Sequence, residues 1–385
     1  MKINKKNIYL IFTAFYIYFT MALFETSKGN FIPFFLEEFK VNNATLSLVL
    51  SMGTVGCVIG SFLGGLLCDK KGHKFVFIFG SIISTISVFI APFTNNIFQL
   101  GLFYFLFGIG RSSLSIAVDS MVPVLSIGFE VILMNVTHFM YGVGSFAGQS
   151  AYGNLLSNGV TWRIIYAFMG IFFALSIILT LFMKTPNMHV VENRAKAKKD
   201  LYKNPLIYMF VAVVTFELVS EAAITTWFIT YMRISYGLNP ADAGKYASIF
   251  FLSFAIGRLL GGFIINKLGD LRGLKIFLFL GSLLVFTGLF LRESGLLLIS
   301  LSGFFLSVGF PTLMVIVNKT FNQNASFAIG LITTISNVLY VIFFNLIGLL
   351  NDVIGSYNAF YSVPILMLSC MAMLIVITRK SNELK

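Results

Sequence analysis

Charged residues are scarce in this chain. Only 11% of the 385 residues are Asp, Glu, Lys or Arg, whereas 57% are hydrophobic. Soluble globular proteins carry roughly a quarter charged residues. The scarcity of charge therefore excludes an ordinary soluble domain and indicates a chain embedded in a membrane.

Cysteine and acidic residues are also few. The three cysteines, Cys57, Cys68 and Cys370, have apolar or helix-end neighbours and no metal-ligand spacing, so we expect no disulfide, metal or cofactor. The 27 basic residues outnumber the 15 acidic ones and leave a net charge of +12. They lie mainly in short loops between apolar runs, so membrane topology explains them better than a nucleic-acid partner.

Recognisable catalytic motifs are missing as well. The sequence contains no nucleotide-binding loop, metal cluster or nucleophile with its base. It therefore predicts neither an ATP-driven pump nor an enzyme.

Long apolar runs fill most of the chain. A helix needs roughly 20 residues to cross a bilayer, and about twelve runs reach that length. We predict an all-α membrane protein with twelve transmembrane helices. The predicted spans are 8–35, 44–68, 74–93, 97–122, 129–155, 162–183, 205–233, 243–266, 273–291, 295–319, 326–350 and 358–378.

The basic residues predict the orientation. The start of the chain is basic, and its first apolar run is too long for a signal peptide, so it reads as the first span. With the N-terminus inside, 19 Lys and Arg residues fall on the cytoplasmic side and 5 on the other. We expect a multi-pass protein of the plasma membrane with both termini in the cytoplasm.

The chain divides into two similar halves. A basic polar segment, 184–204, separates residues 1–183 from residues 205–385, with six predicted spans in each half. Gly65-x3-Asp69-Lys70-x-Gly72 matches Gly262-x3-Asn266-Lys267-x-Gly269 at an offset of 197. Parallel repeats of this size are typical of secondary transporters. We predict two pseudo-symmetric six-helix bundles joined by a cytoplasmic linker.

Three motifs carry a resemblance to a known family. The run from Gly64 to Lys74 resembles the loop 2–3 signature of the major facilitator superfamily, with His73 where Arg or Lys is usual. Thr161-Trp162-Arg163 is similar to the family's Trp-Arg element. Gly142-x-Gly144-x3-Gly148-Gln149 is similar to its span-5 motif, with Gln149 in place of proline, which counts against the drug-antiporter subgroup.

The resemblance covers the whole chain and implies a carrier. It implies that Gly65, Asp69, Lys70, Gly72 and Lys74 form a conformational latch, in which paired glycines let a helix end pack closely on its neighbour. We group Arg258 with this latch, because it lies just above the loop between spans 8 and 9 and can pair with cytoplasmic-end groups. The asymmetry between Asp69 and Asn266 predicts that Asp69→Asn loses transport and retains substrate binding.

A narrower resemblance points to the fucose/glucose proton symporters. It rests on Glu221-x5-Trp227-x3-Tyr231, His138-Phe139-x2-Gly142-x-Gly144 and Gly257-Arg258-x2-Gly261. It also implies protonatable acids in spans 1 and 4, where Glu25 and Asp119 stand.

Charges inside the spans mark candidate sites, because each costs roughly 2.5–3.5 kcal/mol or more at the bilayer centre. Glu25 and Lys28 share one helical face. They form either a proton site with its modulating cation or a static ion pair. Arg111 and Asp119 lie on nearly one stripe. The two alternatives are a protonatable Asp119 that faces the central cavity and an ion pair that fixes span 4 to a neighbouring helix.

Span 7 carries the densest polar cluster. Glu217 and Glu221 are four residues apart and alike in charge, so one should be protonated or have a cationic partner. Trp227 and Tyr231 form a second stripe. We favour substrate contact for Trp227 and Glu221, in which the aromatic face of Trp227 packs against the apolar side of a pyranose. For Tyr231, substrate contact and a place in an interfacial aromatic belt are equally plausible.

Uncharged polar groups complete the candidates. His138 can titrate near neutral pH, or stay neutral and bond a substrate or a neighbouring helix. Gln149 and Asn337 either line the cavity or join helices. Gly309-Phe310-Pro311 interrupts span 10 and is a candidate gating kink.

These features predict proton-coupled symport of a small neutral solute, most plausibly a monosaccharide, by alternating access. Glu25 or Asp119 would take the proton, with Glu217 a further candidate. Expected partners are the solute, protons and the lipid bilayer, and the protein is expected to be a monomer.

The alternative is an exporter or carrier of organic anions or drug-like compounds, in which Lys28 and Arg111 contact an anion. A receptor that retains the fold without transport is the third.

Overall fold

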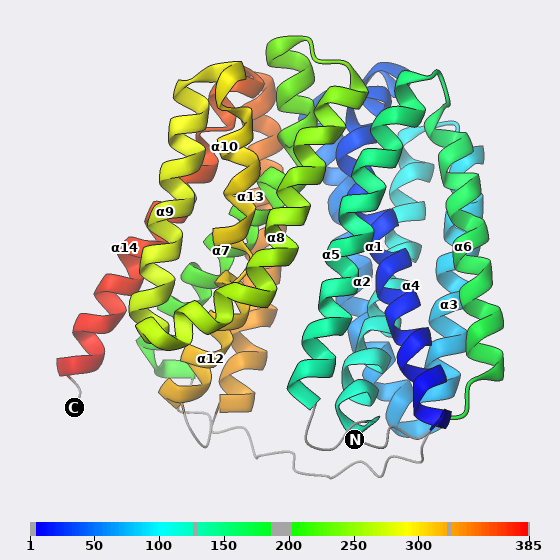
Figure 1. The fold of residues 1–385 in the computed structure, drawn as a ribbon, viewed down its shortest axis with the longest axis horizontal. Helices are drawn as coiled ribbons and strands as arrows, with labels where there is room; N and C mark the ends of the chain where they lie inside the picture. The colour runs from blue at the N-terminus through cyan, green and yellow to red at the C-terminus, as the bar shows by residue number, and fades with distance from the viewer. Residues whose placement is uncertain (1–4, 126–129, 186–201, 322–324, 384–385) are drawn as a thin grey trace. The chain divides into compact units, whose positions relative to one another are not determined.

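The computed structural model describes residues 5–125, 130–185, 202–321 and 325–383 (Figure 1). These residues form helices and loops, and no strand occurs among them. Ten helices in the described ranges are long and apolar enough to cross a membrane, and a shorter apolar helix covers Ser362–Thr378. The predicted all-helical membrane protein is therefore confirmed, while the count of twelve spans and the repeat symmetry stay predictions.

The chain forms two compact units. Unit 1 comprises Met1–Val191 and Asn239–Lys245, and unit 2 comprises Glu192–Leu238 and Tyr246–Lys385. Most of the predicted linker, 184–204, lies outside the described residues. The helices of unit 1 are α1 (Lys5–Phe39), α2 (Asn43–Lys71), α3 (His73–Ile90), α4 (Ile97–Met121), α5 (Glu130–Ser157) and α6 (Trp162–Phe182).

Unit 2 contains the remaining helices, apart from the first residues of α8. They are α7 (Pro205–Tyr236), α8 (Pro240–Leu268), α9 (Asp270–Phe290), α10 (Leu296–Leu301), α11 (Gly303–Leu306), α12 (Gly309–Phe321), α13 (Ala325–Ala359) and α14 (Ser362–Glu383). The predicted span 295–319 is thus divided into three helical pieces. Its last interruption, at Ser307 and Val308, lies directly before the predicted Gly309-Phe310-Pro311 kink, whose residues begin α12.

Polar residues at the loops start several helices. The side chains of Asn42, Asn96 and Asn204 accept hydrogen bonds from the first amides of α2, α4 and α7. Asparagine is a favoured N-cap because its oxygen satisfies an amide that has no partner inside the helix. Gly72 links α2 to α3 with a φ of 82°, a conformation that glycine adopts without strain.

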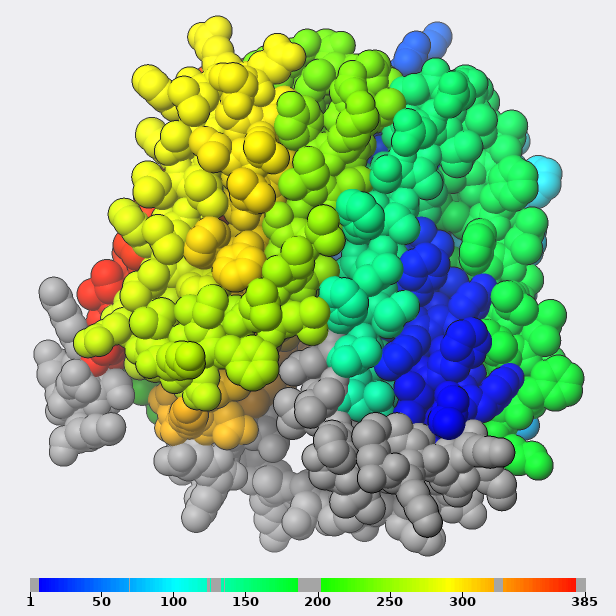
Figure 2. Space-filling model, in the orientation of Figure 1, coloured from blue at the N-terminus to red at the C-terminus, as the bar shows by residue number. Residues whose placement is uncertain are grey.

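The outer surfaces are apolar, as a membrane requires. On α6, the exposed residues Ile164, Phe168, Ile171, Leu175 and Ile178 recur at helical spacing along one face. Figure 2 shows side chains of α6 on the visible face of the molecule. In water, such a continuous apolar face would be an interaction surface, whereas in a bilayer it is the lipid-facing side.

Helices α2 and α4 of unit 1 pack closely on one another. A Cβ atom built on Gly56 would lie 2.0 Å from the carbonyl oxygen of Phe105, and one on Gly108 would lie 2.2 Å from that of Gly53. Small residues allow such backbone approach between membrane helices. The two helices therefore hold together through glycine.

This packing predicts that Gly56→Ala destabilises the protein by about 1–3 kcal/mol, because the added methyl must push two backbones apart. Thermal unfolding in detergent micelles measures the loss. Gly65→Ala is the matched control on the same helix, because a Cβ there meets no atom of the described residues within 4 Å. Equal transition temperatures for the two variants would contradict the packing account.

Candidate functional site

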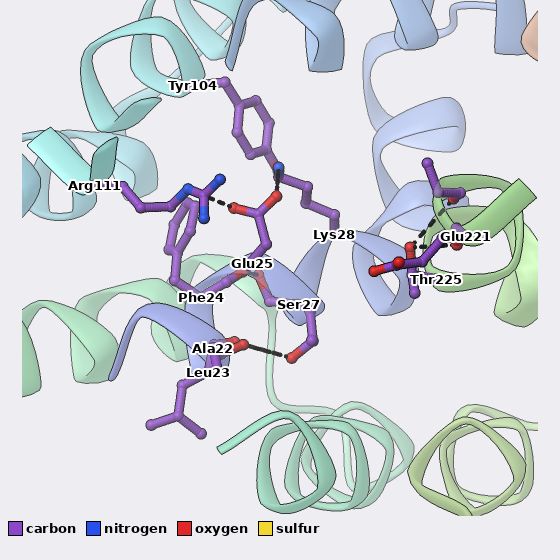
Figure 3. A network of polar contacts seen from close by, with 12 residues as sticks. Ala22, Leu23, Phe24, Glu25, Ser27, Lys28, Tyr104, Arg111, Glu221 and Thr225 are labelled. Carbon is purple, nitrogen blue, oxygen red and sulfur yellow. Dashed lines mark hydrogen bonds and ion pairs between the residues drawn. The ribbon is translucent and has the colours of Figure 1, made fainter. Parts of the chain in front are cut away.

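Unit 1 contains a cluster of three charged side chains between α1 and α4. The carboxylate of Glu25 lies 2.5 Å from Lys28 Nζ and 3.5 Å from Arg111 Nε (Figure 3). The three side chains are between 16% and 29% exposed. Glu25 and Lys28 therefore form the predicted ion pair, and one carboxylate is shared between two cations.

Aromatic side chains surround this cluster. Lys28 Nζ lies 5.4 Å from the centre of the Tyr104 ring, and Tyr104 shares a hydrogen bond of 2.9 Å with the hydroxyl of Tyr166. Phe24 packs against Phe107 with ring centres 3.6 Å apart. A cation beside an aromatic face gains stabilisation from the ring quadrupole. These contacts hold the charged groups in fixed positions.

Within the described part of the chain, Asp119 is hydrogen-bonded to neutral partners. Tyr18 Oη donates a short hydrogen bond to Asp119, and Ser115 Oγ donates one of 3.2 Å. The Tyr18 ring also meets the His138 ring edge-on, with centres 5.1 Å apart. The structure therefore gathers Asp119 and His138 around Tyr18. It pairs Arg111 with Glu25 of α1, so the ion pair between span 4 and a neighbouring helix is made by Arg111.

Gln149 joins two helices of unit 1. Its side chain is fully buried, accepts a hydrogen bond from the Asn30 amide, and donates one of 2.6 Å to the backbone oxygen of Thr26. Both ends of the amide are thus used between α5 and α1. The structure supports the helix-joining alternative for Gln149 over substrate binding.

Unit 2 contains a pair of carboxylates, Glu217 and Glu221, that interact with the cationic side chain of Arg258. Glu217 on α7 is 1% exposed, and Glu221 follows one helical turn later. Glu217 Oε1 accepts a hydrogen bond of 3.1 Å from the backbone N–H of Phe310, while Oε2 has no hydrogen-bond partner among the described residues. Arg258 on α8 interacts electrostatically with both glutamates.

Arg258 therefore differs from its prediction. Its position in the sequence placed it with the latch, beside the loop between spans 8 and 9. In the structure its guanidinium lies over the Phe254 ring, 4.7 Å from the ring centre, and interacts with the acidic pair of α7. Sequence spacing along α8 does not show which residues of other helices act on Arg258, and for this reason the interaction was not predicted.

The aromatic stripe of α7 is buried. Trp227 is 1% exposed and packs against Phe344 of α13, and its indole N–H has no hydrogen-bond partner in the described part of the chain. Tyr231 is also 1% exposed and lies 4.5 Å from the Phe360 ring. This burial does not support an interfacial belt for Tyr231. Asn337 is half-buried on α13.

The predicted latch is only partly visible. Lys70 and Lys74 are exposed on either side of the Gly72 turn, whereas the side chain of Asp69 lies outside the described residues. Gly64 packs as predicted, since a Cβ atom added to it would lie 2.9 Å from Ser113, but an equivalent atom on Gly65 meets no described neighbour within 4 Å. Close packing at Gly65 was therefore a wrong expectation.

His73, the departure from the usual signature, turns inward. It is 8% exposed, and its Nε2 lies 2.9 Å from Ser120 Oγ on α4. A lysine or arginine at this position would bring a permanent charge to the same contact. The substitution by histidine thus exchanges a charge for a hydrogen bond between the start of α3 and the end of α4.

The Trp-Arg element belongs to a polar network at the start of α6. Glu38, at the end of α1, accepts a hydrogen bond of 2.7 Å from Trp162 Nε1 and forms an ion pair with Arg163. Arg163 also donates to the backbone oxygens of Pro92 and Thr94 at 3.0 and 2.8 Å. The motif in the sequence indicated the Trp-Arg element but not Glu38, which is distant along the chain.

This network predicts that Glu38→Ala lowers the stability of the protein by about 1–2 kcal/mol, because the buried indole N–H loses its acceptor. The ion pair itself is partly exposed and adds little. Thermal unfolding measures the effect. Glu37→Ala is a matched control, since Glu37 is exposed on the same helix. If both variants unfold at the wild-type temperature, the network does not hold α1 to α6.

Comparison with known proteins identifies the family. The sequence model of the Major Facilitator Superfamily matches residues 14–338. The chain is 22% identical over 375 residues to an uncharacterized MFS-type transporter of Yersinia pestis, with 94% of each protein covered. It is 24% identical over 330 residues to the nitrite extrusion protein of Bacillus subtilis, covering 80% of this chain and 81% of that protein.

A solved structure shows the same fold. The D-xylose-proton symporter superposes with a TM-score of 0.79, at 14% sequence identity, covering 95% of this chain and 96% of the other. The chain belongs to the Major Facilitator Superfamily. It is therefore a multi-pass membrane transporter and not an enzyme. At this identity the structural likeness shows the fold alone, so the resemblance to the fucose/glucose subgroup stays a prediction.

Proposed function

We propose that this transporter couples the entry of a small neutral polar solute, such as a monosaccharide, to the entry of protons across the plasma membrane. The two halves would alternate access to the solute, with both termini in the cytoplasm. The observation that carries this proposal is the Glu217–Glu221 pair of α7, in which Glu217 is buried and Glu221 is half-buried, together with the cationic Arg258 that interacts with both.

The charge balance of this pair favours a bound proton. Two ionised carboxylates beside one guanidinium leave an excess negative charge among membrane-spanning helices, where unbalanced charge is costly. One proton on the pair makes the group neutral. Glu25 has the opposite balance, because Lys28 and Arg111 both contact it and keep it ionised. We therefore assign the coupled proton to Glu217 and Glu221 instead of Glu25 or Asp119.

Unpaired polar atoms in the described part of unit 2 suit a hydroxylated solute. Glu217 Oε2 is an acceptor, and Trp227 Nε1 and Arg258 Nε are donors, all buried and without hydrogen-bond partners in the described residues. Buried polar groups normally find partners, so such atoms point to water or a ligand. Trp227 adds an aromatic surface suited to the apolar face of a sugar ring. Unit 2 thus supplies the chemistry of a monosaccharide site.

Uptake by proteoliposomes tests this function. Labelled D-xylose, L-fucose and D-glucose would be offered with and without a pH gradient, acidic outside. We expect at least one of them to accumulate only with the gradient, and a protonophore to abolish the accumulation. If every transported solute is taken up to the same extent with and without the pH gradient, proton coupling is refuted.

A second candidate is a carrier of small anions. The Glu25 cluster has two cations for one carboxylate, and its excess positive charge suits an anionic substrate. The similarity to the nitrite extrusion protein favours the same candidate. Measurement of nitrate or nitrite flux in the same liposomes decides between the two. Anion flux without sugar uptake would replace the symport proposal.

A further inference from the structure

Glu217 is bonded to the backbone of another helix at a point where that helix is interrupted. Its Oε1 accepts a hydrogen bond of 3.1 Å from the N–H of Phe310, the second residue of α12. The first amides of a helix have no carbonyl partner within it. A carboxylate from α7 therefore fills the place of an N-terminal cap on α12.

The local sequence forces this interruption. α11 ends at Leu306 and α12 begins at Gly309. Pro311 has no N–H to donate, and its ring clashes with a helical carbonyl four residues earlier. The start of α12 thus cannot be stabilised by an unbroken run of helical hydrogen bonds. It depends on an external acceptor.

Gly309 makes room for that acceptor. A Cβ atom at this position would lie 2.2 Å from Glu217 Oε1 and 2.9 Å from its Cδ. Any larger residue would displace the carboxylate from the Phe310 amide. The glycine and the glutamate therefore form one structural device, which we call the α12 clamp, consisting of Glu217, Gly309 and Phe310.

Charged and titratable groups face the clamp from several helices. Glu221 lies on the same helix, Arg258 faces it from α8, and the thiol of Cys370 faces it from α14. Glu217 Oε2 is buried and has no partner among the described residues, so it is free to take a proton without breaking another bond. The clamp therefore has two states that differ by one proton.

We propose that Glu217 is a positioning residue that links its own protonation to the position of the start of α12. An ionised carboxylate accepts a hydrogen bond roughly twice as strong as a neutral acceptor does. Loss of the proton tightens the clamp, and gain of the proton loosens it and frees the middle of the tenth span. This inference rests on the proposed function only in taking the Glu217 proton to be the coupled one.

Hydrogen–deuterium exchange measured by mass spectrometry on the protein in liposomes tests the clamp directly. The peptide of interest spans residues 303–321, and rates are corrected for the pH dependence of intrinsic exchange. We expect its protection in the wild type to rise about fivefold from mildly acidic to mildly alkaline pH, as a neutral hydrogen bond becomes a charge-assisted one.

Three variants sharpen the test. Glu217→Gln keeps a neutral acceptor of the same shape and should give weak protection that no longer varies with pH. Gly309→Ala should give weak protection at every pH, because the methyl displaces the side chain. Glu37→Gln is the matched control: it makes the same chemical change at an exposed position on α1 and should retain the pH response. A pH response that persists in Glu217→Gln would overturn the clamp.

The same liposomes separate the clamp from the proposed function. Proton movement with solute is measured beside the exchange experiment. A pH-dependent clamp in a protein that moves no protons would support the clamp and reject symport. Proton-coupled transport with no change in protection would reject the clamp and leave symport standing.

Discussion

Replacing both Glu217 and Glu221 by glutamine should abolish solute accumulation driven by a pH gradient. A gradient of one pH unit across the membrane is worth about 1.36 kcal/mol per proton. Under such a gradient, a carrier that takes one proton with each solute accumulates the solute about tenfold at equilibrium. Without either carboxyl group the carrier has lost its proton site, and the expected ratio falls to about one. Exchange of internal for external solute should survive, because glutamine keeps the shape and neutrality of the protonated acid.

The measurement is the steady-state concentration ratio of labelled solute in proteoliposomes, followed by the rate of exchange at equal pH. Glu37→Gln is the matched control, since it makes the same change at an exposed position and should keep the tenfold ratio. The variant Asp119→Asn separates the sites. If it loses accumulation while the Glu217 and Glu221 double variant retains it, the proton site lies in unit 1 and our assignment fails.

Replacing Glu25 by glutamine should have the second-largest effect. It leaves Lys28 and Arg111 close together without the carboxylate that both contact. Removal of one partner from a buried ion pair costs about 3–5 kcal/mol, and partial exposure reduces this to about 2 kcal/mol here. We expect a lower unfolding temperature and a loss of transport.

The double variant Glu25→Gln, Lys28→Met provides the control. It restores the net charge of the wild-type cluster, so it should recover most of the lost stability. Recovery of stability without transport would assign the pair a direct part in transport. If Glu25→Gln alone unfolds at the wild-type temperature, the three charges do not stabilise unit 1 as described.

The sequence predicted the helices well because long apolar runs are a strong signal in a membrane protein. Loop residues such as Asn42, Asn96 and Gly72 end or start helices for reasons visible in the sequence. The interruption directly before Gly309-Phe310-Pro311 was predictable for the same reason, since proline removes a backbone donor.

Contacts between helices were harder to predict. Helical spacing placed Arg111 and Asp119 on one stripe, but the partner of Arg111 is Glu25 on another helix. Helical spacing likewise showed that Glu217 and Glu221 share a face of α7. It did not show that Arg258 interacts with them. Periodicity describes one helix at a time, whereas ion pairs depend on how helices pack.

Contacts from side chain to backbone were not predictable at all. The bond from Phe310 N–H to Glu217 joins two positions 93 residues apart, and only the missing Cβ of Gly309 permits it. Glu38 contacts Trp162 and Arg163 through side chains alone, and it was also absent from the candidates because the contact joins distant helices. Such contacts require the packed structure.

The most direct test of proton coupling reverses the driving force. Proteoliposomes containing a pH-sensitive dye receive a solute gradient at equal internal and external pH. We predict that inward flow of the transported solute acidifies the interior, and that the Glu217→Gln, Glu221→Gln variant exchanges solute with no change in dye signal. Solute entry into wild-type liposomes without acidification would contradict proton coupling.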